Sequence, residues 1–87
     1  MSDESERAGA AARALAAAAR EADFVEFVDG AGVCWRVRER DARADPGSRA
    51  DWCLVFSCQD ALRRVWDYTP DWRTLARTDL IALSWHR

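Results

Sequence analysis

Short apolar runs separated by turn residues predict a β-hairpin in the first half of the chain. Residues 24–28 (FVEFV) are rich in β-branched and aromatic side chains, and residues 33–38 (VCWRVR) alternate apolar with polar ones. The intervening residues 29–32 (DGAG) supply two glycines for a tight turn. Alternation places the apolar residues of the second strand on one face of the sheet: Val33, Trp35 and Val37.

Two further strands are predicted beyond a long polar segment. Residues 39–51 contain Pro46-Gly47 and indicate a mobile loop, whereas residues 52–58 (WCLVFSC) are the most apolar run and predict a central strand. Residues 62–68 (LRRVWDY) predict a fourth strand because they combine β-forming side chains with turn residues on either side. A helix over residues 60–67 is the alternative, since apolar residues there also recur at helical spacing.

Near its C-terminal end, the chain has the pattern of two short helical segments. Thr69 and Pro70 predict the start of a helical turn that ends near Leu75. Thr78 and Asp79 then predict the start of a second, amphipathic helix. The apolar residues of that helix recur at helical spacing: Leu80, Ile81, Leu83 and Trp85.

The N-terminal quarter of the chain is dominated by alanine. Residues 7–22 have high helix propensity and predict a helix behind a flexible acidic lead at residues 1–6. The only large apolar side chain of this helix is Leu15, so the helix has no strong apolar stripe to bury. We therefore expect it to pack weakly against the rest of the protein.

Together these elements predict an α+β fold. We expect a three- to four-stranded antiparallel β-meander packed against short C-terminal helices, with the Ala-rich N-terminal helix outside it. Residues 23–87 would form one small domain, with residues 1–22 weakly attached. The predicted core consists of apolar residues from the strands and the C-terminal helical segments: Val33, Trp35, Val37, Leu54, Phe56, Trp66, Trp72, Leu80 and Leu83.

Composition narrows the class of protein. A chain of 87 residues suffices for one small domain, and its five tryptophans supply much of a core, so we expect three or four of them inside. A net charge of −2 argues against a general nucleic-acid binder, despite thirteen arginines.

The acidic start lacks the positive region of a signal peptide, and the alanine run of residues 8–19 is too short for a membrane span. We therefore expect no membrane insertion and a cytoplasmic location with reduced thiols.

The sequence offers no complete catalytic group. The single histidine, His86, is the penultimate residue, and Ser84 lies two positions before it, which leaves a nucleophile without a rigid base. The glycines of residues 29–32 lack the lysine and the following helix of a phosphate-binding loop. Carboxylates are expected to be solvated or at helix starts, and include Glu39, Asp60, Asp67, Asp71 and Asp79. We therefore predict a protein that is not an enzyme and binds no cofactor.

Three cysteines and the histidine give the number of ligands that a zinc site needs. Cys34, Cys53 and Cys58 nevertheless lack the close pairing typical of such sites, and a separation of five places Cys53 and Cys58 on opposite sides of one strand. We expect thiols packed in or near the sheet, with no metal ligands. A metal-binding module remains the second alternative function.

A line of arginines is the most suggestive feature of the sequence. Arg36, Arg38 and Arg40 alternate, so a strand presents them on one face, and Arg63 or Arg64 of a neighbouring strand could join them. Such a face could bind phosphate, carboxylate or an acidic protein surface. The alternative is a solvated outer face whose charge is balanced by acids of other segments, such as Asp51, Asp60 and Asp67.

Three segments resemble a family of small uncharacterised proteins from GC-rich bacteria. They are residues 35–39 (WRVRE), 54–57 (LVFS) and 63–72 (RRVWDYTPDW). The resemblance covers residues 24–85 and implies a strand–loop–strand–strand layout that ends in a Pro-x-Trp turn and a leucine-rich helix. It supports a strand over residues 62–68 and implies no activity or cofactor.

The leading functional interpretation is a small non-enzymatic protein-interaction or accessory protein. We expect a partner with an acidic or mixed surface. The residues predicted to bind it are Arg36, Arg38, Arg40, Arg63 and Arg64. The alternative is RNA or single-stranded nucleic-acid binding through the same face, although Trp35 lies on the opposite face and an RNA-binding sheet needs aromatic side chains beside the basic ones.

Overall fold

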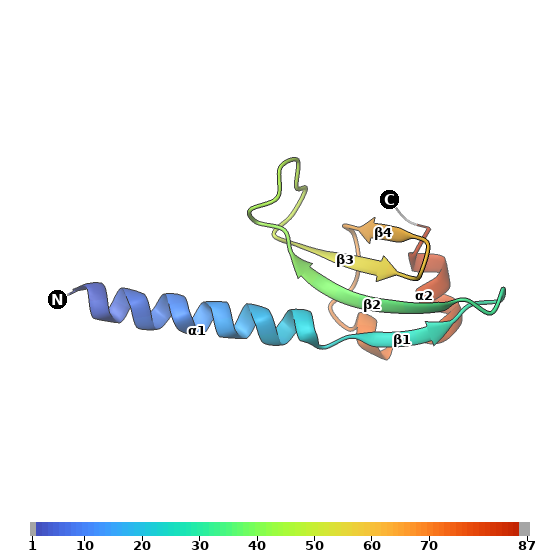
Figure 1. The fold of residues 1–87 in the computed structure, drawn as a ribbon, viewed down its shortest axis with the longest axis horizontal. Coiled ribbons are helices and arrows are strands. Elements are labelled where there is room, and N and C mark those ends of the chain that lie inside the picture. Colours follow the sequence, from blue (N-terminus) through green and yellow to red (C-terminus); the bar gives the residue numbers. More distant parts are fainter. Residues whose placement is uncertain (1, 86–87) are drawn as a thin grey trace.

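The computed structural model describes the backbone of residues 2–85 and the side chains of residues 7–85. Its elements are α1 (Ser2–Ala22), β1 (Val25–Val28), β2 (Cys34–Asp41), β3 (Trp52–Ser57), β4 (Leu62–Val65), the 3₁₀ helix η1 (Trp72–Thr74) and α2 (Arg77–Leu83). The four strands lie in sequence order in one antiparallel sheet, and α2 lies against one of its faces (Figure 1). The predicted α+β fold and its four-stranded meander are thereby confirmed.

The first hairpin is held together by Asp29. One carboxylate oxygen of Asp29 accepts hydrogen bonds from the backbone N–H groups of Ala31 at 2.8 Å and Val33 at 3.0 Å. The other oxygen accepts one from Nε1 of Trp35 at 2.8 Å. Gly32 adopts a φ of 81°, a conformation that a side chain would strain. The predicted turn is therefore present, but Val33 belongs to it rather than to β2, and is exposed instead of in the core.

The hydrophobic core lies between η1, α2 and one face of the sheet, which we call the inner face. Alternation along the strands supplies its side chains, and the rings of Phe27 and Phe56 meet edge to face with centroids 6.4 Å apart. Leu83 is only partly buried, and Trp66 lies on the other face because Val65 takes the inward position of β4. The buried core residues are Phe27, Trp35, Val37, Leu54, Phe56, Val65, Trp72 and Leu80.

The opposite face, which we call the outer face, is partly covered by the loop of residues 42–51. β2 continues to Asp41, beyond the predicted end of the strand, and the loop after it is closed by a 2.7 Å hydrogen bond from the N–H of Ala42 to the carbonyl of Asp51. A second small hydrophobic cluster is buried there against Trp66: Ala42, Cys53 and Val55. The polar loop therefore shields the centre of β3, which explains why this strand is apolar on both faces.

The segment after β3 forms a strand, as favoured over the helical alternative. β4 ends at Val65, three residues before the predicted end, because the chain then turns toward η1. The N–H of Trp72 donates to the carbonyl of Thr69, which closes a turn around Pro70 and Asp71, and the 3₁₀ helix η1 follows this turn directly. Beyond α2, Trp85 is 65% exposed and is the most exposed of the five tryptophans.

Helix α1 extends away from the sheet as an arm (Figure 1). The molecule consequently measures 57 × 24 × 24 Å. Leu15 is 72% exposed, so the one large apolar side chain predicted for this helix is not used for packing. The helix begins at Ser2, earlier than predicted, and its C-terminal half approaches the sheet, where Arg13 and Arg20 line a hollow with Trp52. Within residues 2–85, no helix has both the length and the apolar character needed to cross a membrane.

Candidate functional site

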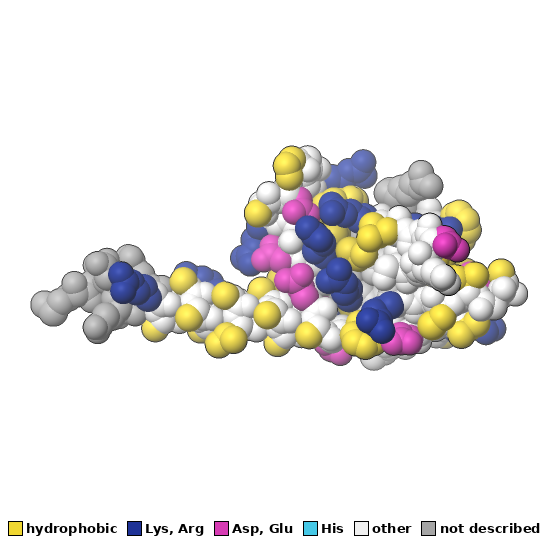
Figure 2. All heavy atoms as spheres, in the orientation of Figure 1, with side chains coloured by type: hydrophobic (Ala, Val, Ile, Leu, Met, Phe, Trp, Pro, Cys, Tyr) yellow, Lys and Arg dark blue, Asp and Glu magenta, His cyan; other side chains and the backbone are white. Residues whose placement is uncertain are grey.

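The arginines predicted to bind a partner lie on both faces of the sheet. Arg36, Arg38 and Arg40 of β2 project from the outer face, and Arg64 shares this face because the register aligns it with Arg38 across β3. Arg63 projects from the inner face. On the outer face, basic side chains form an oblique row with carboxylates beside it (Figure 2). The structure therefore brings four of the five predicted arginines together.

Carboxylates of the same chain already engage most of this row. Nη2 of Arg36 lies 3.2 Å from Oε1 of Glu26 on β1. Asp45, in the loop over the outer face, lies 3.3 Å from Arg40 and 3.4 Å from Arg64. Within residues 7–85, the acids predicted to balance the row form no ion pairs: Asp51, Asp60 and Asp67. The balance comes instead from acids that the hairpin and the folded loop bring to the arginines.

A hollow of about 320 Å³ lies beside β4, and we call it the β4 hollow. Its lining is mainly basic and consists of Arg49, Leu62, Arg63, Arg64, Trp66 and Ser84. Leu62 is 62% exposed, so a large apolar side chain adjoins three guanidinium groups. Arg49 was not predicted as a site residue. It comes from the loop of residues 42–51, and only the folding of that loop brings it to β4.

Arg63 is positioned by aromatic side chains. Its guanidinium carbon lies 4.9 Å from the ring centroid of Trp35 and 4.0 Å from that of Trp85, and Nη1 donates to Oγ of Ser84 at 3.4 Å. Such cation–π contacts hold a guanidinium without neutralising its charge. Arg63 therefore lines the β4 hollow from the inner face with a charged guanidinium that is fixed in position, and Arg64 lines it from the outer face.

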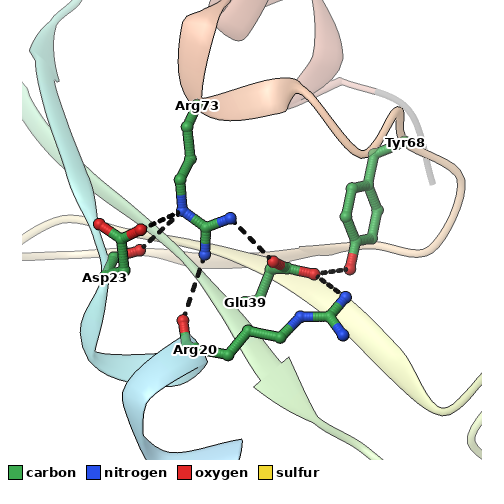
Figure 3. A network of polar contacts seen from close by, with 5 residues as sticks. All are labelled: Arg20, Asp23, Glu39, Tyr68 and Arg73. Carbon is green, nitrogen blue, oxygen red and sulfur yellow. Dashed lines mark hydrogen bonds and ion pairs between the residues drawn. The ribbon is translucent and has the colours of Figure 1, made fainter. Parts of the chain in front are cut away.

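A buried carboxylate, Glu39, connects the end of α1 to the sheet and to η1 (Figure 3). The side chain of Glu39 is 3% exposed and accepts hydrogen bonds from Arg20 and, at 2.7 Å, from the hydroxyl of Tyr68. Nη1 of Arg73 lies 3.2 Å from its other oxygen, and Arg73 also pairs with Asp23 at 2.8 Å. Glu39 was predicted to be solvated. It is buried because β2 continues through it with its side chain on the inner face.

The surroundings of Glu39 keep it ionised. Burial raises its pKa, but the hydrogen bonds from Arg20 and Tyr68 outweigh burial and lower the pKa to about 2. Burial and the adjacent carboxylate raise the pKa of Tyr68. The indole N–H of Trp72 also lowers the pKa of Glu39, although it does not reach hydrogen-bond geometry and has no partner within the described residues. A carboxylate held in this way is a structural anchor, because a group with so low a pKa is a poor proton donor or acceptor near neutral pH.

The cysteines lie apart from one another. Cys34 is exposed on the outer face, Cys53 is buried under the loop on that face, and Cys58 packs against the core of the inner face. Within the described part of the chain, no three residues of the ligand types His, Cys, Asp and Glu are grouped so as to hold a metal ion. His86, the fourth candidate zinc ligand, lies outside the described residues.

Comparison with known proteins adds no functional assignment. No protein-family model matches the chain, and no curated protein or solved structure shows detectable similarity to it. The geometry of the β4 hollow and of the arginine row is therefore the basis for the functional conclusion.

Proposed function

We propose that the protein is a small non-enzymatic interaction module that binds an acidic segment of a partner protein at the β4 hollow. The observation that carries the proposal is the convergence of Arg49, Arg63 and Arg64 on one hollow that also exposes Leu62. Guanidinium groups bind carboxylates through charge-assisted, often paired hydrogen bonds, and arginine and tryptophan dominate the binding energy of many interfaces. The arginines of β2 extend the same basic surface.

Asp45 supports a carboxylate as the ligand of this surface. Its two oxygens accept from Nε and Nη2 of Arg40 at 3.3 and 3.4 Å, and one of them also lies 3.4 Å from Nη1 of Arg64. The side chains of Arg40 and Arg64 are 40% and 38% exposed, so a partner carboxylate can approach the same guanidinium groups from solvent. Asp45 thus acts as an internal competitor that a partner must match or displace.

An acidic protein segment fits this surface better than RNA does. The chain has a net charge of −2, and carboxylates interrupt the arginine row at two places, which weakens the field that a phosphate backbone would meet. Trp35, the aromatic residue of β2, is buried on the inner face, where it cannot stack on a base. Nucleic acid remains an outcome that the binding experiment distinguishes.

The proposed role is that of an accessory protein in the cytoplasm. Three free thiols, one of them exposed, are suited to a reducing compartment. The carboxylate of Glu39 is buried and paired with Arg20 of α1 and with Arg73 of η1, so it is not accessible to a partner. The charged groups that a partner can contact are therefore the surface arginines.

The proposal is tested by the affinity of the peptide Thr-Val-Glu-Glu-Val-Thr-amide, with fluorescein attached to its N-terminal amine in place of an acetyl group, measured by fluorescence anisotropy. We expect the double variant Arg49→Gln/Arg64→Gln to bind the peptide at least about tenfold more weakly, because two charge-assisted contacts are lost. The matched control is Arg7→Gln/Arg13→Gln, which removes the same charge from α1, away from the hollow. We expect its affinity to stay within about twofold of the wild type.

Two results would contradict the proposal. One is a peptide affinity that falls equally in both double variants, which would show attraction by overall charge alone. The other is tighter binding of a single-stranded oligouridine of eight nucleotides, with a steep dependence on salt, which would favour the nucleic-acid alternative.

A further inference from the structure

The two edges of the sheet differ in how their outward backbone groups are used. In an antiparallel pair, hydrogen-bonded and non-hydrogen-bonded residue pairs alternate along the strands. The N–H of Cys58 donates to the carbonyl of Ala61 at 2.9 Å, which marks a hydrogen-bonded pair. Arg63 is therefore bonded to β3, whereas Leu62 and Arg64 direct their N–H and C=O groups away from the sheet. These groups form no other hydrogen bonds within the described residues.

At the opposite edge, β1, one of the outward backbone groups already forms a hydrogen bond within the chain. The bond from the N–H of Asp29 to the carbonyl of Val33 places the outward positions of this strand at Glu26 and Val28. The carbonyl of Val28 accepts a hydrogen bond from Nη1 of Arg77 at 3.3 Å. β1 also carries an acidic side chain at Glu26. Of the two edges, β4 is therefore the one that combines free backbone groups with positive charge.

We propose that the partner segment is extended and adds to β4 as a fifth strand, an inference that rests on the proposed function of the β4 hollow. Strand addition satisfies the outward groups of Leu62 and Arg64, and main-chain hydrogen bonds supply affinity while side chains supply specificity. β4 reads apolar–Arg–Arg–apolar, from Leu62 to Val65. Its complement is a segment that reads apolar–acid–acid–apolar, with one acid on each face of the extended sheet.

The charges of β4 favour a different protein over a second copy of this chain. Because Arg63 and Arg64 lie on opposite faces, two β4 strands paired edge to edge in a symmetric register centred on either residue would place that arginine directly opposite its own copy. Like charges directly opposite each other destabilise a strand pair. An acidic strand would instead place carboxylates opposite Arg63 and Arg64, and this pairing of opposite charges is favourable.

The backbone contribution is tested with a methylated version of the peptide used above. This version carries methyl groups on the amide nitrogens of both valines and both glutamates, so that charge is retained while N–H donors are lost. We expect it to bind the wild-type protein at least about tenfold more weakly. Equal affinity of the two peptides, together with loss of binding in Arg49→Gln/Arg64→Gln, would overturn strand addition and leave the proposed function standing.

A matched pair of proline variants tests the same point from the protein side. Leu62→Pro removes an outward N–H from β4, and Val28→Pro removes one from β1; proline is tolerated at such edge positions. We expect Leu62→Pro to weaken peptide binding at least about tenfold and Val28→Pro to leave it within about twofold. Equal binding by both variants would refute strand addition at β4. If neither the plain nor the methylated peptide binds the wild-type protein, the proposed function fails as well.

Discussion

Replacing Glu39 with glutamine is predicted to remove a large part of the protein's stability. Glu39→Gln keeps the shape of the side chain but removes the charge that Arg20 and Arg73 share, and it places an amide donor against their N–H groups. Breaking a buried pair by neutralising one partner is costly because the remaining groups are left without their partner. Since small domains unfold at about 5–15 kcal/mol, the loss would be a large fraction of the total.

The magnitude follows from the pKa of Glu39. Its pKa falls from an ordinary 4.5 to about 2 in the folded protein, and each pKa unit corresponds to about 1.36 kcal/mol, so ionisation of this carboxyl stabilises the fold by about 3 kcal/mol. Because the folded-state pKa is the lower one, this stabilisation is complete above pH 4.5. It is lost as the pH falls toward 2.

The assay is urea unfolding followed by tryptophan fluorescence, for the wild type and Glu39→Gln, at pH 7 and at steps between pH 5 and pH 2. We expect a difference of about 3 kcal/mol at pH 7 that shrinks as the pH falls, since the other carboxyls are common to both proteins. Glu26→Gln is the control, because the pair of Glu26 and Arg36 is about half exposed and is expected to contribute less than about 1 kcal/mol. A difference below about 1 kcal/mol for Glu39→Gln, or one that does not change with pH, would refute the reasoning.

Three further predictions concern the loop, the thiols and the arm. Asp45→Asn should tighten binding of the acidic peptide about two- to fivefold in anisotropy measurements, because the internal competitor for Arg64 is lost; weaker binding would contradict this role. In the native protein, Ellman's reagent should modify Cys34 much faster than Cys53, whose pKa is raised by burial; equal rates would show that the loop does not cover Cys53. Limited trypsin digestion, followed by mass spectrometry, should cut α1 at Arg13 before it cuts the sheet; early cleavage within the strands would contradict an exposed arm.

Local patterns were enough to predict the sheet. Alternation in residues 33–38 and the glycine turn before them are properties of neighbouring residues, and the strand periodicity that they imply is the one observed. The choice between strand and helix for β4 was harder, because the apolar residues there recur at helical spacing; the β-forming side chains and the turn residues on either side indicated the correct one. The predicted positions of the strand ends were less accurate, because turns and tertiary contacts decide where strand pairing stops.

The contacts that define the site depend on residues distant in the sequence, and local patterns do not reveal them. Glu39 lies in a charged stretch and was predicted to be solvated, yet β2 continues through it and buries it beside Arg20 and Tyr68. Asp45 and Arg49 belong to a loop whose composition indicates only that it is polar. The way this loop folds over the outer face decides which arginines of the sheet lie near Asp45 and Arg49. A polar residue one position beyond an alternating strand, on its apolar face, is the signal that could have identified Glu39.

The most direct test of acidic-segment binding at β4 is an NMR titration of the ¹⁵N-labelled protein with acetyl-Thr-Val-Glu-Glu-Val-Thr-amide. The account predicts that amide shifts change most at Leu62, Arg64 and Arg49, and that the amide hydrogens of Leu62 and Arg64 exchange more slowly with solvent when the peptide is bound. Amide shifts confined to β1 or to α1, with unchanged exchange at Leu62 and Arg64, would contradict it.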